Sequence, residues 1–185
     1  MKTHLRLIYA IAVLASFPAA SAQEIPKPTA EHRALAKEAG TWDAEVRVWM
    51  QGPGAEPETS TGVEEITVLP GGLWTTSKFD GKMGDLPFTG RSISGYDPVK
   101  KKFVDVWVDS TDPHMLILEG DIDPASKILT HHGKTTDPRS GKSYDVKTVT
   151  DVKQDDRREF TFYIKNDDTG GDYVKILEMT YKRRK

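Results

Sequence analysis

The stretch GTWDAEVRVWM, residues 40–50, decides the fold class that this sequence predicts. Trp42 begins an apolar face on which every second residue falls, and charged residues occupy most of the positions between. A period of two is typical of a β-strand with one buried face. The preceding residues 29–39 differ, because Thr29 can cap a short helix that Gly40 would end. The pattern therefore changes from a short helix to a strand at Gly40.

Strand-like runs and turn signals alternate from there to the C-terminus. Further strands are expected near Gly62–Leu69, Leu73–Phe79, Phe88–Gly95, Phe103–Asp109, His114–Gly120, Ile128–His132, Ser143–Val152, Glu159–Lys165 and Tyr173–Lys182. Asp-Pro steps favour turns between them, and no second helical segment of useful length appears, which excludes alternating βαβ units. Closing a long meander removes its exposed edges. The predicted fold is all-β: an antiparallel up-and-down β-barrel of about ten strands with a short N-terminal helix. A two-sheet sandwich is the alternative.

The first residues have the three parts of a secretory signal peptide. A basic head at residues 2–6 precedes an uncharged run at 7–17, and Ala20-Ser21-Ala22 supplies a small-x-small cleavage site. The apolar run is shorter than the ~20 residues that a helix needs to cross a bilayer, so no membrane anchor is expected. We predict cleavage of a signal peptide at residues 1–22, an extended leader at 23–28, a single barrel domain at 29–185, and a periplasmic or secreted location.

The composition excludes one class of binding partner and two kinds of covalent link. The chain has 185 residues, with 26 basic and 28 acidic side chains and a formal net charge of −2. Apart from the C-terminal Lys182–Lys185 there is no basic cluster, whereas nucleic-acid binding needs a broad basic surface, so nucleic acid is excluded as a partner. The chain has no cysteine, so neither disulfides nor a lipid on an N-terminal cysteine can be expected.

The segment Phe103–Asp109 is the most suggestive for function. As a strand it places three valines on one face and two aromatic and two acidic residues on the other: Phe103, Asp105, Trp107 and Asp109. In one interpretation the valines form the core and the second face is exposed. In the other, the second face lines a small-molecule cavity, because such cavities combine aromatic walls with a few polar groups. The two aspartates would lie ~13 Å apart along the strand, too far for a paired glycosidase acid and base.

No sequence motif indicates catalysis or metal binding. The nucleophile elbow G-x-S-x-G, the zinc motif H-E-x-x-H, the P-loop and the Rossmann fingerprint are all missing. Adjacent His131 and His132 would point to opposite faces of a strand, so they cannot readily share one metal ion. We therefore predict no catalytic residues, no metal and no cofactor. The segment Asp80–Gly90 has three glycines and is expected to be a loop, either at the barrel mouth or against the barrel surface.

Two resemblances bear on the fold. Gly40-Thr41-Trp42 at the head of the first strand resembles the entry motif of lipocalins and other calycins, in which a basic residue from the last strand packs over the tryptophan. That resemblance implies barrel closure by Trp42 with Arg183 or Lys182. The segments GTWD, GYDPVKKKF and WVDS together resemble the bacterial DUF1579 family, which implies a calycin-like barrel without an assigned activity. Related barrels can hold haem through one inward histidine, a role open to His114 or His132, although an ordinary polar histidine is the preferred interpretation.

The sequence thus favours an exported protein that binds a small apolar or amphipathic molecule. The candidate ligand-binding residues are Phe103, Asp105, Trp107, Asp109, His114, Phe162 and Leu177. One alternative is an enzyme, an isomerase or hydrolase, that uses Asp105, Asp109 or His114 as acid or base in the same cavity. The other is a structural barrel whose interior is filled by side chains.

Overall fold

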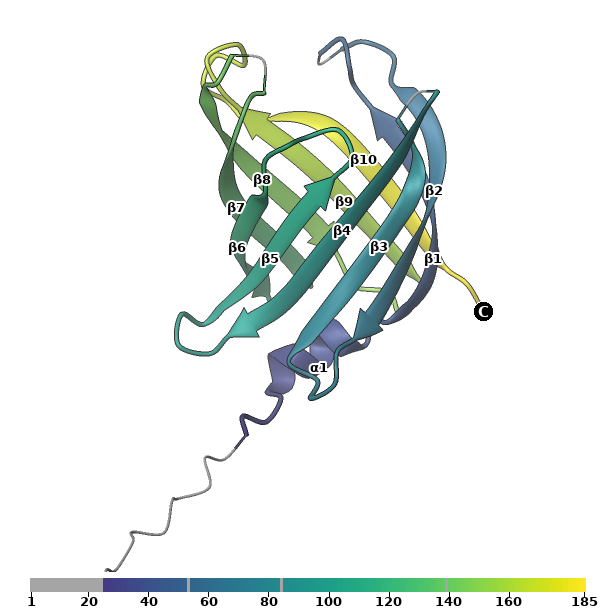
Figure 1. Ribbon diagram of the computed structural model, residues 1–185, viewed down its shortest axis with the longest axis vertical. Helices are drawn as coiled ribbons and strands as arrows, with labels where there is room; N and C mark the ends of the chain where they lie inside the picture. The colour runs from purple at the N-terminus through teal and green to yellow at the C-terminus, as the bar shows by residue number, and fades with distance from the viewer. Residues whose placement is uncertain (1–24, 53, 84, 139) are drawn as a thin grey trace, which may run out of the picture.

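The computed structural model describes residues 25–52, 54–83, 85–138 and 140–185, so the predicted signal peptide lies outside the described residues. This part of the chain forms one helix and ten strands (Figure 1). They are α1 (Ala30–Ala36), β1 (Gly40–Val48), β2 (Glu58–Val68), β3 (Trp74–Met83), β4 (Leu86–Asp97), β5 (Lys102–Asp109), β6 (Leu116–Asp123), β7 (Ile128–Thr136), β8 (Ser143–Asp151), β9 (Arg157–Lys165) and β10 (Val174–Arg183).

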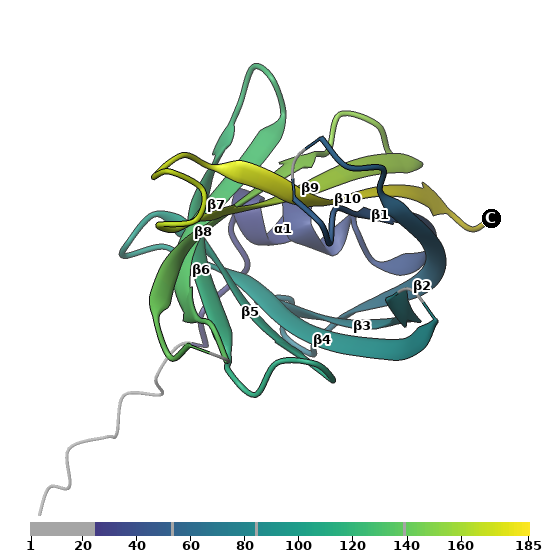
Figure 2. The same ribbon diagram turned by 90° about the horizontal axis from the view of Figure 1, so that it is seen from above.

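The ten strands form one closed antiparallel barrel. Each strand pairs with its neighbours in the chain, and β1 pairs with β10 to complete the ring, in the register Trp42↔Arg183 to Val48↔Leu177. Figure 2, which views the molecule from above, shows this ring with α1 behind its opening, and α1 contacts β3 and β4. The up-and-down barrel predicted from the sequence is confirmed, and the two-sheet sandwich is excluded.

The alternation along β1 shows which of its residues contribute to the hydrophobic core. Its inward residues Trp42, Ala44, Val46 and Val48 are buried, and the charged residues between them are exposed. The first hydrophobic cluster combines this face with Ile66, Phe79, Met179 and Tyr181, and a second cluster contains Leu116, Leu118 and Val146. The larger cluster therefore lies where the two ends of the chain meet.

Two hairpins turn at Asp-Pro steps in the same way. In the β4–β5 turn, the Asp97 carboxylate accepts hydrogen bonds from the backbone N–H groups of Val99 and Lys100. In the β6–β7 turn, Asp123 accepts one from Ala125. A lysine with a positive φ of 56° follows in each turn, at positions 101 and 127. Aspartate thus bonds the backbone ahead of it, as such turns require.

The structure corrects two sequence-based boundaries. The helix ends at Ala36 rather than near Ala39, and single hydrogen-bonded turns follow it as far as Ala39. The expected loop at Asp80–Gly90 is wrong, because β3 and β4 pair across most of it, through Asp80↔Thr89 to Met83↔Leu86. A hairpin of two long strands thus replaces the predicted loop.

Trp42 closes the helix end of the barrel between two arginines. Its ring is fully buried, and its indole N–H donates a hydrogen bond of 2.9 Å to the Glu38 carbonyl. The guanidinium carbon of Arg183 lies 4.1 Å from the ring centroid, and that of Arg158 lies 4.8 Å away. Lys182, the other residue considered, is exposed and pairs with Asp43 in the ladder. Trp42 thus has a cationic partner on β10 and a second one on β9.

Arg183 also connects the helix to the last strand. Its guanidinium donates to the carbonyls of Ala39 at 2.6 Å and Lys37 at 2.8 Å, just beyond α1, and its Nε donates to the carbonyl of Asp155 at 2.8 Å. A cation at the C-terminal end of a helix satisfies carbonyl groups that lack partners within the helix. One side chain therefore holds α1 against the barrel and covers Trp42.

Candidate ligand-binding cavity

The barrel interior contains a cavity of about 540 Å³. Inward residues of all ten strands line it, and Ala34, Leu35 and Glu38 from the helix segment contribute to its closed end. Small-molecule pockets commonly have volumes of ~300–1,000 Å³, mostly apolar walls and a few polar groups. This cavity lies within that range, so the barrel is not the completely filled one that the sequence left open.

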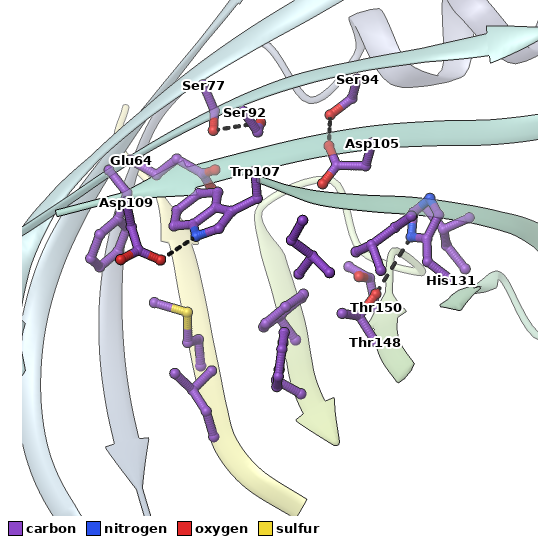
Figure 3. Close-up of a pocket in the computed structure, with 18 of the residues that line it drawn as sticks. Glu64, Ser77, Ser92, Ser94, Asp105, Trp107, Asp109, His131, Thr148 and Thr150 are labelled. Atoms are coloured by element: carbon purple, nitrogen blue, oxygen red, sulfur yellow. Dashed lines mark hydrogen bonds between the residues drawn. The ribbon is translucent and has the colours of Figure 1, made fainter. Parts of the chain in front are cut away.

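One wall of the cavity is aromatic. Phe88 lies between two partners, with ring centroids 6.0 Å from Phe79 and 6.4 Å from the nearly parallel ring of Trp107. The Trp107 indole lies over Gly90, where an added Cβ would be 2.1 Å from the ring. Glycine is required there because any side chain would displace the indole. The indole N–H of Trp107 donates a hydrogen bond of 2.9 Å to the Asp109 carboxylate. Figure 3 shows these two side chains side by side.

A polar group of side chains lies on the same wall, nearer the helix. Ser77 and Ser92 share a hydrogen bond of 2.9 Å, and the Ser94 hydroxyl donates to Oδ1 of Asp105 (Figure 3). Burial raises the pKa of Asp105 to about 7, and the nearby Glu64 carboxylate adds to the rise, whereas the Ser94 bond opposes it. Asp105 is therefore an acid that can gain or lose a proton near neutral pH.

His131 of β7 and Thr148 of β8 form a second polar group, and β7 is separated from the Asp105 strand, β5, by β6 alone. The hydroxyl of Thr148 lies 3.5 Å from Nδ1 of His131, a long contact, and both side chains are buried (Figure 3). Burial lowers the pKa of His131 to about 4, and the adjacent His132 contributes to the decrease. His131 is therefore neutral at physiological pH and offers one donor and one acceptor.

A buried ion pair completes the closed end. Arg158 of β9 contacts the carboxylate of Glu64 from β2 and lies 3.4 Å from that of Glu38. It also lies 4.2 Å from the centroid of the Tyr181 ring. Buried charges are tolerated when they are paired and hydrogen-bonded, as here. Both terminal nitrogens of Arg158 therefore have a carboxylate partner.

The structure places every sequence-predicted ligand-binding residue on the cavity lining: Phe103, Asp105, Trp107, Asp109, His114, Phe162 and Leu177. They come together because inward residues of a closed barrel meet around one axis. His114 lies farther out and pairs with Asp112 at 2.9 Å. The alternative that put the valine face of β5 in the core is wrong, because Val108 is 40% exposed.

The histidine expectation is also corrected. His132 is exposed and lies beside Tyr173, with ring centroids 6.1 Å apart, whereas His131 is the inward member of the pair. Sequence reasoning also missed Arg158, Glu64 and Ser94. The signal for Arg158 was present, since it lies two residues before inward-facing Phe160 on the same strand.

Within the described residues, no group of three or more histidine, aspartate or glutamate side chains is placed to hold a metal ion. The described helix is also too short to cross a membrane.

A closed ten-stranded barrel around an interior cavity defines a calycin-like barrel protein. The family model described as "Protein of unknown function (DUF1579)" matches residues 27–183, and the chain belongs to this family. No curated protein matches the chain.

Two solved structures show a distant likeness. EF1p2_mFAP2b bound to DFHBI is 14% identical, with a TM-score of 0.41, over 83% of this chain and 99% of that one. A protein of unknown function from the DUF3598 family of Nostoc punctiforme is 8% identical, with a TM-score of 0.24, over 85% of this chain and 100% of that one.

Proposed function

We propose that this protein binds one small, mainly apolar molecule inside its barrel. The observation that supports this proposal best is the cavity of about 540 Å³, with an aromatic wall and two small polar groups. A barrel built only for structure would fill its axis with side chains. Polar groups that face such a space fix the orientation of a ligand, and the apolar walls supply most of the affinity.

The ligand would enter at the end opposite α1. The cavity extends there to Met50, which is 59% exposed, and to the partly exposed His114–Asp112 pair. At the other end, α1, Trp42 and the arginine pair block access. One closed and one open end suit a protein that holds a molecule lengthwise.

We further propose that the protein works outside the cytoplasm, after removal of residues 1–22. The support is the basic head, the apolar run and the small-residue site read from the sequence. A carrier or scavenger of sparingly soluble molecules is a suitable function for such a location.

Thermal unfolding in the presence of apolar probes tests the binding proposal. A probe at a hundred times its Kd should add about 2.7 kcal/mol to the free energy of unfolding. Fatty acids, retinoids, haem, terpenoid quinols and long-chain amines form a suitable panel. Trp107→Ala should change the response, and Trp49→Ala, which removes a tryptophan that does not line this cavity, should not. A flat response to every probe would refute the proposal.

A further inference from the structure

Asp105 has an unused acceptor inside the cavity. Its Oδ1 takes the hydrogen bond from Ser94, but its Oδ2 has no partner among the described residues. Figure 3 shows the second oxygen turned away from Ser94. The carboxyl group also forms no ion pair with a described side chain, although it lies deep in the barrel. A buried carboxyl group without a counter-charge is costly, and proteins usually provide such groups with a partner.

The charged lining of the cavity is strongly one-sided. Among the described lining residues there are five carboxyl groups, at Glu38, Glu64, Asp105, Asp109 and Asp112, but only one arginine and no lysine. That arginine, Arg158, is already engaged by Glu64 and Glu38. Among the cavity-lining residues that the structure describes, no further lysine or arginine is placed to pair with the carboxyl group of Asp105. An anionic head group such as that of a fatty acid would therefore enter an unfavourable field.

Aromatic rings flank the free acceptor. Phe103 and Trp107 lie two residues before and after Asp105 on the inward face of β5. A cation that contacts a carboxylate between ring faces gains charge-assisted hydrogen bonding and cation–π attraction together. Beyond Trp107, towards the open end, Phe88 and Leu177 form an apolar wall, and Asp109 and Asp112 bring two further carboxyl groups to the lining. The cavity thus has a carboxyl group between two aromatic rings and, beyond it, a mainly apolar wall that ends at a polar opening.

We infer that the ligand is a cationic amphiphile: a protonated amine that binds Asp105 and carries an apolar body directed towards the open end. This inference rests on the proposed binding function and adds the class of ligand. The raised pKa of Asp105 agrees with it, since burial without a cation disfavours the ionised carboxylate and a bound ammonium would restore it.

Three probes with the same apolar body test the inference: decylamine, decanol and decanoate. Their affinities are measured by isothermal titration calorimetry at pH 8, where a primary amine is still protonated because its pKa is near 10.4. Decylamine should bind about tenfold or more tightly than the other two, because a hydrogen bond to a charged group is the stronger kind. Asp105→Asn should remove this preference and leave decanol unchanged. The matched control Asp121→Asn removes the same charge from the outer surface and should have no effect.

The pH dependence gives a second measurement. Below the pKa of Asp105 a proton competes with the amine, so decylamine should bind about tenfold more weakly at pH 6 than at pH 8. Other titratable groups face this part of the cavity, so the assignment depends on the dependence vanishing in Asp105→Asn. These groups are Glu38, Glu64, Asp109, His131, Arg158 and Tyr181.

The outcomes separate the two proposals. If decanol or decanoate binds as tightly as decylamine, the cavity binds ligands but the cationic class is wrong. If decylamine binds best and Asp105→Asn retains the preference, Asp105 is not the anchor and the inference fails. If none of the three binds, and the thermal panel is also flat, the binding function itself is refuted.

Discussion

Replacing Trp42 tests the closed end of the barrel, where the two ends of the chain meet. Trp42→Ala empties a fully buried ring, and such truncations cost ~3–5 kcal/mol. The Glu38 carbonyl also loses its indole partner, at a cost of ~1–3 kcal/mol if it stays buried and unpaired. Domains of this size are stable by only ~5–15 kcal/mol, so Trp42→Ala is expected to leave the protein marginally folded.

A double-mutant cycle with milder changes isolates the contact with Arg183. Trp42→Phe, Arg183→Met and the double variant are compared by urea denaturation, followed by far-ultraviolet circular dichroism because the tryptophan content changes. Arg183→Met also loses three bonds to backbone carbonyls, but that loss occurs in both backgrounds and cancels in the cycle. The guanidinium lies 4.1 Å from the ring centroid, which predicts a coupling energy of ~0.5–1 kcal/mol.

Lys182→Met provides the matched control for this cycle. Lys182 is the neighbouring residue on β10, but it is exposed and directed away from the Trp42 ring. Its coupling to Trp42 should be no more than the ~0.3–0.5 kcal/mol scatter of independent sites. If Arg183 also shows no more than this, or if Lys182 shows as much coupling as Arg183, the proposed closure by Trp42 and Arg183 is refuted.

Three further predictions concern other parts of the chain. Protein recovered from the periplasm or medium should begin at Gln23 by N-terminal sequencing, and an N-terminus at Met1 would contradict export with cleavage. Gly90→Ala should displace the Trp107 indole and destabilise the fold by ~1–3 kcal/mol, as overpacking does. The clash requires the Trp107 ring, so Gly90→Ala should lower the free energy of unfolding far less in a Trp107→Ala background than in the wild type, as measured by denaturation. Equal losses in the two backgrounds would refute this explanation of Gly90. Between pH 7 and pH 5, the titrations of His131 and of Asp105 should each change the free energy of unfolding by about 2 kcal/mol, in opposite directions. The lowered pKa of His131 makes the protein less stable on acidification. The Asp105→Asn variant lacks the opposing contribution of Asp105, so it should lose stability as the pH falls. The raised pKa of Asp105 makes stability rise on acidification, as His131→Gln should show, and parallel curves for the two variants would show that the assigned shifts are wrong.

The sequence predicted the barrel because its decisive signals are local. The alternation in β1 and the Asp-Pro turns are visible within short windows, and ten such segments without a second long helix leave few architectures. The inward face of β5 was left open between two interpretations. The two sides of an isolated strand become inequivalent only when its partners are known, and the pairs Ser94↔Asp105 and Asp105↔Leu118 define that context.

The errors arose where a residue's role depends on a partner distant in the sequence. Gly81 and Gly90 suggested a loop, but both glycines lie inside paired strands and make room for the rings of Phe79 and Trp107. Arg158 and Glu64 are separated by 94 residues, so no local pattern reveals their ion pair. Periodicity identifies strands well, but it does not show which ring packs on which glycine.

The pairing of β1 with β10 also constrains how this chain can fold. Nine of the ten strand pairs join neighbours in the sequence, and the tenth joins Gly40–Val48 to Val174–Arg183 near the other end of the chain. Long-range pairings of this kind form slowly because the entropy of loop closure is lost before the contacts form. A chain that lacks its last strand would expose two sheet edges, on β1 and β9, each able to pair with another molecule. The barrel can therefore close only after β10 has been synthesised, and truncations that remove β10 should give aggregates rather than smaller barrels.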